Sequence, residues 1–358
     1  MDEKIEEIPI YEVAGSFREM GQQFGEACRE KVHELYEIRL ENALEHAKDR
    51  GRELEEERAL VLAEDCLKVC QTYFPEGYDE FLGICEGADI SAAELYICQG
   101  LTDFRDFLSW GALPDGYGCT SLIIPASKTE NKHILLGQTW DLQTNNMPYV
   151  CLVKRQPSNA PQTVYMTTTG GLALIGMNEH GLSIGTNNIK CNDSRLGLHY
   201  LFIIHKFLQY RNIAKALPSI SEAQRAGAHY YYYADECHYG AVECSAKKHA
   251  FVQNGSFIQH SNHCLLPEIK ELESEDAGES SIFRSEQVKK LLKNHQEHST
   301  TTIKNILSDQ TGNALAINRY NYKNISSNGS VIMEPASKRF WACRTQADRG
   351  KWKEVSLG

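Results

Sequence analysis

A glycine followed by a cysteine stands at the centre of the stretch DGYGCTS, residues 115–121. The chain before it, from 15 to 108, is patterned mainly as helices, whereas short β-prone runs separated by turn signals follow Cys119. These runs cover residues 119–126, 133–139, 149–156, 162–168, 172–177 and 181–186. Their spacing is typical of antiparallel strands. The stretch therefore marks the change from a helical segment to a sheet-forming one.

The segment before this stretch opens with a short strand within residues 1–14. Ser16 and Glu19 have the spacing of a capping box, which predicts a long helix from there to about residue 49. Its glycines at 21 and 25 share one face of the helix and predict a tight crossing with another helix. Further helices are expected over residues 52–73, 76–86 and 92–108.

The remainder of the chain alternates between helices and strands. Helices are expected over residues 200–208, 213–217, 221–225, 281–296 and 300–309, with an exposed acidic loop at 266–280. Strands are expected over 229–234, 240–245, 250–253, 312–320, 330–335, 338–343 and 351–356. Because the helices come in blocks between blocks of strands, an α+β domain with two stacked sheets fits better than a parallel βαβ fold.

Composition excludes several classes of protein. The 358 residues carry a net charge of -11, which argues against nucleic acid or an anionic membrane as the main partner. Neither a signal-peptide pattern nor a run of about 18 apolar residues is present, so we expect no membrane span. The twelve cysteines have no regular spacing and are expected to be reduced thiols of a cytoplasmic protein.

The Gly118–Cys119 bond suggests a specific chemistry. Cutting it would make Cys119 an N-terminal residue that carries both a thiol and a free α-amine. An α-amine has a reference pKa of about 7.7–8.0, so it can serve as the general base for its own thiol. The alternative is an ordinary strand cysteine that follows a glycine turn. The heptapeptide alone leaves both interpretations open.

Three further residues are candidates for the same site. Asp141, in GQTWD, lies 22 residues after Cys119, where an antiparallel neighbour strand would bring it back; otherwise it is a turn-capping residue. Asn262, in HSNH, has an amide suited to bind an oxyanion. Arg319 ends an apolar run and could neutralise Asp141, or it could be a surface residue at a strand end. Arg344 is a second candidate, on weaker grounds, for the arginine that neutralises Asp141.

A metal site is the competing interpretation of the histidines and cysteines in the second half of the chain. The potential ligands are Cys237, His238, Cys244, His260, His263 and Cys264. Their spacing matches no common zinc motif and contains no C-x₂-C pair. We therefore expect neither a metal nor another cofactor.

Seven short stretches together resemble the acyl-coenzyme A:6-aminopenicillanic acid acyltransferase family, also called the C45 peptidase family, of N-terminal nucleophile hydrolases. The stretches are GSFREMGQQFGE, GYGCTS, GQTWD, GMNEHGLSIGTNN, HSNH, INRY and VIMEP, and they occur in family order across nearly the whole chain. The resemblance implies an α+β fold, a four-layer αββα sandwich, with a mainly helical N-terminal segment.

The resemblance also implies autocatalytic cleavage of an inactive precursor, or zymogen, between Gly118 and Cys119. Residues 1–118 and 119–358 would then remain together as one αββα unit. By position, Cys119 matches the thiol nucleophile, Asp141 the nearby carboxylate, Asn262 the oxyanion donor and Arg319 the family arginine.

The activity implied by the resemblance is that of a hydrolase or an acyltransferase. Cys119 would attack a small-molecule amide or acyl thioester, and water or an amine would then take the acyl group. Tyr117, Trp140 and Tyr149 are candidates for lining the acyl pocket, although core packing explains aromatic residues equally well. The residues leave the acyl donor, the acceptor and the oligomeric state open, a homo-oligomer included. The alternatives are a non-catalytic binding or scaffold protein that keeps the fold, and a metal-binding regulatory protein.

Overall fold

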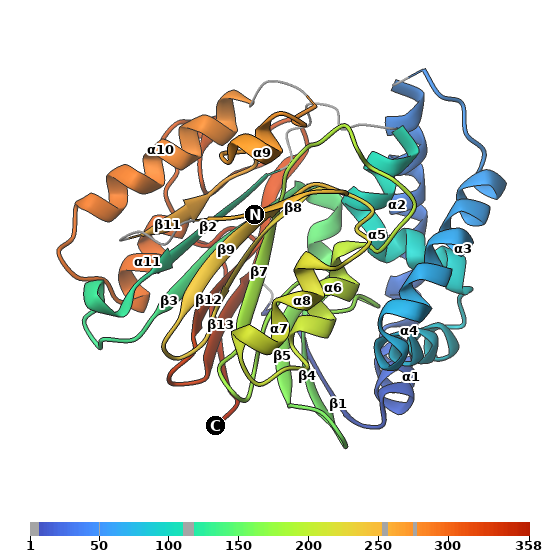
Figure 1. Ribbon diagram of the computed structural model, residues 1–358, viewed down its shortest axis with the longest axis horizontal. Helices are drawn as coiled ribbons and strands as arrows, with labels where there is room; N and C mark the ends of the chain where they lie inside the picture. Colours follow the sequence, from blue (N-terminus) through green and yellow to red (C-terminus); the bar gives the residue numbers. More distant parts are fainter. Residues whose placement is uncertain (1–6, 50, 110–117, 253–256, 275–277) are drawn as a thin grey trace, which may run out of the picture.

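The computed structural model describes residues 7–49, 51–109, 118–252, 257–274 and 278–358. Two sheets lie face to face, and helices cover the outer face of each (Figure 1). The expected α+β sandwich of four layers is therefore present. Within the described ranges, no helix has the length and apolar run that crossing a membrane requires.

The N-terminal segment forms one strand and a group of helices, as the sequence predicts. The strand is β1 (Ile10–Gly15), and the helices are α1 (Phe17–Ala27), α2 (Arg29–Asp49), α3 (Glu56–Tyr73), α4 (Pro75–Ala88) and α5 (Ala92–Ser109). The capping box of Ser16 and Glu19 starts α1. The expected single long helix is broken at Cys28, whose thiol donates to the Phe24 carbonyl oxygen at the end of α1.

The first sheet has eight strands in the order β1-β4-β5-β6-β7-β8-β9-β10 within the described residues. Beside β1 these are β4 (Val150–Pro157), β5 (Thr163–Thr168), β6 (Ile175–Asn178), β7 (Ser183–Asn188), β8 (His229–Ala234), β9 (Tyr239–Cys244) and β10 (His249–Phe251). Neighbouring strands are antiparallel except for β1, which pairs parallel to β4. The N-terminal segment thus supplies an edge strand to a sheet built mostly from the second part of the chain.

The second sheet has six antiparallel strands in the order β11-β2-β3-β12-β13-β14, counted over the same ranges. They are β11 (Ile258–His260), β2 (Gly118–Ile124), β3 (Leu135–Gln143), β12 (Ile325–Glu334), β13 (Arg339–Arg344) and β14 (Lys353–Ser356). The inner faces of the two sheets are joined by Gln138 of β3, which donates to the Thr186 carbonyl oxygen at 2.6 Å. Its amide oxygen accepts from the Tyr232 hydroxyl of β8 at 2.6 Å.

Each outer helical layer packs on its own apolar core. The helices α10 (Glu279–Lys293) and α11 (Thr300–Leu307) cover the six-stranded sheet, where Val288, Ile303 and Ile332 belong to one buried cluster. The N-terminal helices lie over the eight-stranded sheet together with α6 (Tyr200–Phe207), α7 (Ile213–Ala216) and α8 (Pro218–Ser221). The connections contain the short helices η1 (Ala126–Lys128), η2 (Thr144–Tyr149), α9 (Pro267–Lys270) and η3 (Asn313–Leu315).

One predicted strand is wrong, and it matters for the site. Residues 312–320 form no strand, because Gly312 and Asn313 take positive φ angles of 90° and 52° and turn the chain into η3. Ala316 and Ile317 are buried all the same, with Ile317 in the cluster under the outer helices. Two smaller differences are that the predicted loop 266–280 contains α9, and that the helix expected at 221–225 instead ends at Ser221 as α8.

The glycines of α1 meet a second pair of glycines on α4, which explains their spacing. A Cβ atom at Gly21 would clash with the Glu80 carbonyl oxygen, and one at Gly25 with the Ile84 carbonyl oxygen. Conversely, a Cβ at Gly83 would clash with the Arg18 carbonyl oxygen of α1. The two backbones are therefore in direct contact, and the predicted tight crossing is confirmed.

Gly21→Ala is expected to lower the free energy of unfolding by about 1–3 kcal/mol, the usual cost of overpacking. The clash outweighs the roughly 1 kcal/mol by which alanine favours a helix over glycine. Urea unfolding of both proteins measures the difference. The control is Gly278→Ala, where an added Cβ meets no atom within 4 Å and should cost less than about 1 kcal/mol. A Gly21→Ala protein as stable as the parent would contradict the close approach.

Candidate active site

Cys119 lies at the start of β2, opposite the end of β3. The register pairs Gly118 with Asp141 and Cys119 with Trp140, so the carboxylate lies beside the cysteine as an antiparallel neighbour strand predicts. The Cys119 side chain is buried, with 6 % of the residue exposed. Two segments separated by 22 residues thus form one corner of the site.

Asn262 reaches the same place from β11. His260 of β11 pairs with Ser121 of β2, so the chain that follows passes alongside the start of β2. The Cys119 backbone N–H donates to Asn262 Oδ1 at 2.9 Å, and Asn262 Nδ2 donates to the Asn188 carbonyl oxygen at 2.8 Å. The loop is fixed further by the Asn262 backbone N–H, which donates to Ser281 Oγ at 2.7 Å. The side-chain amide of Asn262 therefore directly faces the cysteine nitrogen.

Asp141 is fully buried, and its two oxygens have different surroundings. Its Oδ1 accepts from the Ser327 hydroxyl at 2.7 Å, whereas its Oδ2 accepts no hydrogen bond from the described residues. The Arg319 guanidinium lies with Nε 3.7 Å from Oδ2. Burial raises the pKa of Asp141, and the charges of Arg319 and Arg284 oppose that rise. One buried carboxylate oxygen thus lies beside the Gly118–Cys119 bond without a hydrogen-bond donor from the described residues.

Arg319 lies in the loop before β12 and not at the end of a strand. Its backbone N–H donates to Ser327 Oγ at 2.9 Å, which couples it to the residue that holds Asp141. Its side chain is 3 % exposed and also donates to Ser280 Oγ. The other three residues predicted from the sequence for the catalytic site therefore lie around Cys119, with Arg319 on the side of Asp141.

Arg284 of α10 is a further residue of this site that the sequence interpretation missed. Its Nη1 donates to the Cys119 carbonyl oxygen and, at 2.9 Å, to Thr120 Oγ1, and its Nη2 donates to Asn262 Oδ1 at 2.7 Å. The signal that could have found it is helical periodicity. Arg284 falls on the buried face of α10, in line with the residues Ser281, Ser285, Val288 and Leu292.

The surroundings of the Cys119 thiol contain groups that raise its pKa and groups that lower it. Burial, followed by the Asp141 carboxylate, raises the pKa of Cys119 to about 12. The Arg284 charge and the backbone N–H groups of Asp141 and Asn188 lower it. In the continuous chain the thiol is therefore protonated at neutral pH, and a base is needed to make it a nucleophile.

A small cavity of about 30 Å³ adjoins Cys119, which is room for about one or two water molecules. Trp140 lines it together with Leu174, Tyr200 and His229. Of the other pocket candidates, Tyr149 is not among the described lining residues, because its hydroxyl donates instead to Glu34 of α2 at 3.0 Å. Tyr117 lies outside the described residues.

His229 was not singled out from the sequence, although it lines the cavity. Its Nε2 is 2.8 Å from Asp103 Oδ1 of α5, and its ring stacks on Tyr200 at 4.4 Å. The other Asp103 oxygen accepts from the Tyr200 backbone N–H at 2.8 Å. The N-terminal segment therefore contributes a buried acidic residue directly behind the cavity wall.

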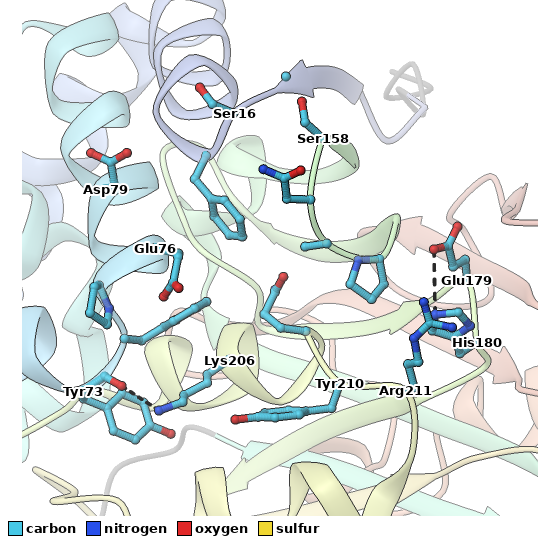
Figure 2. Close-up of a pocket in the computed structure, with 18 residues that line it drawn as sticks. Ser16, Tyr73, Glu76, Asp79, Ser158, Glu179, His180, Lys206, Tyr210 and Arg211 are labelled. Atoms are coloured by element: carbon cyan, nitrogen blue, oxygen red, sulfur yellow. Dashed lines mark hydrogen bonds and ion pairs between the residues drawn. The ribbon is translucent and has the colours of Figure 1, made fainter.

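A larger cleft of about 850 Å³ lies at the other end of β7 (Figure 2). Glu179 and His180, just before β7, line this cleft, whereas Asn188 at the end of β7 lines the cavity beside Cys119. In Figure 2, Lys206 points toward Tyr73, to whose carbonyl oxygen it donates at 2.6 Å. None of the four predicted catalytic residues lines the cleft, so its size does not make it the reaction site.

The histidines and cysteines considered for a metal have other surroundings. Over the described ranges, no group of three or more histidine, cysteine, aspartate or glutamate side chains is arranged to hold a metal ion. His260 is buried with its Nε2 2.9 Å from Glu243 Oε1, and Cys237 is exposed. His263 Nδ1 lies 2.7 Å from Ser281 Oγ, and burial lowers the pKa of this histidine to about 4.

Comparison with known proteins supports the resemblance seen in the short stretches. The sequence pattern of the family described as acyl-coenzyme A:6-aminopenicillanic acid acyl-transferase matches residues 127–348. The match covers more than half of the chain. The chain belongs to this family. Because the match begins after Cys119, it does not itself assign the cleavage site.

A related protein from Emericella nidulans bears the name acyl-coenzyme A:6-aminopenicillanic-acid-acyltransferase 40 kDa form. It is 25 % identical to this chain over 257 residues, which are 70 % of the chain and 68 % of the relative. The family and this relative indicate an enzyme of the acyltransferase type.

Solved structures with a similar arrangement share little sequence with the chain. A mutant of the conjugated bile acid hydrolase from Clostridium perfringens has a TM-score of 0.47 and 11 % identity, and covers 66 % of this chain and 92 % of its own. Penicillin V acylase from Agrobacterium tumefaciens has a TM-score of 0.39 and 10 % identity, and covers 66 % of this chain and 86 % of its own.

Proposed function

We propose that this protein is a self-cleaving enzyme whose nucleophile is Cys119, made N-terminal by a cut after Gly118. The observation that carries the proposal is the buried Asp141 Oδ2, which has no hydrogen-bond donor among the described residues beside the cleavage bond. A buried carboxylate oxygen without a donor is costly. The α-amine that cleavage creates at Cys119 supplies N–H donors next to that oxygen.

The cut follows from the chemistry of the thiol and its neighbours. Cys119 Sγ attacks the Gly118 carbonyl carbon, the C–N bond breaks, and the thiol proton passes to the departing nitrogen. The product is a thioester with a free α-amine, and water then hydrolyses the thioester to give the Gly118 carboxylate and the thiol. Glycine at 118 leaves room for these groups, because a Cβ there would lie 2.9 Å from Arg284 Nη2 and 3.1 Å from Asp141 Oδ2 and would press on both side chains.

The same groups support turnover of a substrate. The α-amine takes the thiol proton, Cys119 attacks the carbonyl carbon of an amide or acyl thioester, and the protonated amine returns its proton to the leaving group. An N–H of Asn262 Nδ2 stabilises the tetrahedral oxyanion. Water or an amine then resolves the acyl-enzyme, so the reaction is that of an amidohydrolase or an acyltransferase. The name of the fungal relative favours a small-molecule acyl thioester as donor.

The two products of the cut stay together in this proposal. Strand β1 of residues 1–118 pairs with β4 along its whole length, and Asp103 holds His229 of residues 119–358. Both contacts are independent of the Gly118–Cys119 bond. The twelve cysteines, none of which forms a disulfide, support a reducing compartment such as the cytoplasm.

The test combines intact-mass measurement of the protein, expressed at full length and purified, with N-terminal sequencing of the chains that it contains. We expect two chains that divide between Gly118 and Cys119 and coelute as one species. Iodoacetamide should then label Cys119, and a screen of small-molecule amides and acyl thioesters should give an acyl adduct on the chain 119–358. A single mass of the full chain after long incubation, with no labelling of Cys119, would instead favour a non-catalytic binding protein.

A further inference from the structure

We propose that Arg284 is a positioning residue that fixes the side-chain amide of Asn262 and the carbonyl group of Cys119 for both the cut and turnover. This inference rests on the proposed function and adds to it a residue from the outer helical layer. Arg284 is 1 % exposed and reaches from the first half of α10 to Cys119 at the start of β2 and to Asn262 after β11. Its contacts leave it little freedom to move.

The guanidinium holds three groups of the site at once. Nη1 donates to the Cys119 carbonyl oxygen and to Thr120 Oγ1, and Nη2 donates to Asn262 Oδ1 at 2.7 Å. Nε donates to Ser280 Oγ at 3.2 Å, which fixes the plane of the group. An arginine offers donors in a rigid planar fork, so this arrangement sets directions as well as distances.

The donors of Arg284 decide which way the Asn262 amide points. A guanidinium cannot accept a hydrogen bond, and the Cys119 backbone N–H is also a donor. Both converge on one end of the amide, at 2.7 and 2.9 Å, so that end is the oxygen. The NH₂ end then points away, and one of its two N–H groups donates to the Asn188 carbonyl oxygen. The second N–H is left to bind an oxyanion.

Arg284 and Arg319 thereby have different tasks. Arg319 lies beside the Asp141 carboxylate, whereas Arg284 contacts Cys119 and Asn262, and Ser280 Oγ accepts from both arginines. Burial and the charge of Arg319 lower the pKa of Arg284 to about 10, which leaves it charged at neutral pH. Its charge is the largest of the effects that lower the pKa of the Cys119 thiol.

Substitutions Arg284→Met, Arg284→Lys and Arg225→Met separate the effects of positioning and charge from that of packing. Arg284→Met removes the hydrogen-bonding fork and the charge. We expect its uncut chain to accumulate and to cleave about 100-fold more slowly than the parent. The second readout is the rate of Cys119 alkylation as a function of pH, followed in the processed protein on the peptide that carries Cys119. The midpoint of this curve should rise by about one pH unit. Arg284→Lys restores a charge but not the fork, so the midpoint should return toward that of the parent while cleavage stays slow.

The matched control is Arg225→Met. Arg225 is also buried and donates to backbone carbonyl oxygens, those of Ser245, Ile220 and Lys248, but it lies outside the site. Its loss should lower stability and leave both the cleavage rate and the alkylation midpoint unchanged. If Arg284→Met does not fold, Arg284→Lys alone still tests the fork through the cleavage rate.

Two outcomes would overturn the inference. Either Arg284→Lys cleaves at the parental rate, or Arg284→Met changes both readouts no more than Arg225→Met does. Failure of the proposed function gives a different result: the parent protein itself is not cut between Gly118 and Cys119. If the parent cleaves and the Arg284 variants cleave equally fast, the proposed function stands and only the positioning role of Arg284 is contradicted.

Discussion

Cys119→Ala is expected to yield one uncut chain of 358 residues and no turnover. The substitution removes the only atom that attacks in the proposed cut and in the proposed acyl transfer. Loss of a covalent nucleophile commonly lowers a rate by about a million-fold. The fold should be retained, because the cysteine side chain is small. Its replacement also leaves the backbone contacts of Cys119 with Asn262 and Arg284 in place. Intact mass and a thermal melt measure the two effects.

The control for this prediction is Cys343→Ala. Cys343 is fully buried in β13 of the same sheet and is not among the residues that line the Cys119 cavity. Its variant should cleave as the parent does. Cys119→Ser is a graded test, because a hydroxyl is a weaker nucleophile than a thiol and should give slow cleavage at the same bond. Two fragments from Cys119→Ala would show that another group makes the cut.

The strands around the site could be predicted because their signals are local. The turn between residues 126 and 134 joins two β-prone runs, and antiparallel pairing then brings Asp141 beside Cys119 without any knowledge of the rest of the fold. The capping box of α1 and the glycines at its crossing are equally local. In each case the residues that decide the structure lie within about two dozen positions of one another.

The remaining site depends on contacts that no short stretch specifies. Asn262 reaches Cys119 only because β11 pairs at the edge of β2, across about 140 residues of chain. Arg319 was expected at a strand end, but positive φ angles at Gly312 and Asn313 turn its segment into a loop. Arg284 was missed because a charged residue in an amphipathic helix is normally on the exposed face. Its spacing from Val288 and Leu292 places it on the buried face of α10, and the packing of α10 on the sheet brings it to Cys119.

Asp141→Asn is expected to slow cleavage and turnover at Cys119 while making the Cys119 thiol easier to ionise. Cleavage and turnover should fall by about 100-fold or more, because the neutral amide no longer holds the α-amine or balances the charges of Arg319 and Arg284. The thiol should instead ionise more readily. Asp141 is the second-largest cause of the raised pKa of Cys119, after burial, and removing its charge lowers that pKa.

The sign of the second effect makes the prediction specific. With a lower pKa, a larger fraction of Cys119 is thiolate at any pH below the midpoint, so alkylation by iodoacetamide at pH 8 should be faster in Asp141→Asn than in the parent. The comparison requires processed protein from both, with the peptide that carries Cys119 followed by mass. Asp193→Asn is the control, since Asp193 accepts hydrogen bonds from the turn at 245–247, away from the site.

A variant that merely disturbs the fold cannot give this combination. Loosened packing would slow cleavage and also expose the other eleven cysteines, ten of which are buried, to alkylation. Loss of the Asp141 charge alone should accelerate the labelling of Cys119 and leave those ten unlabelled. Slower alkylation of Cys119 together with slower cleavage would mean that Asp141 activates the thiol directly. The carboxylate would then not be the partner of the α-amine, which is the step on which the proposed mechanism depends.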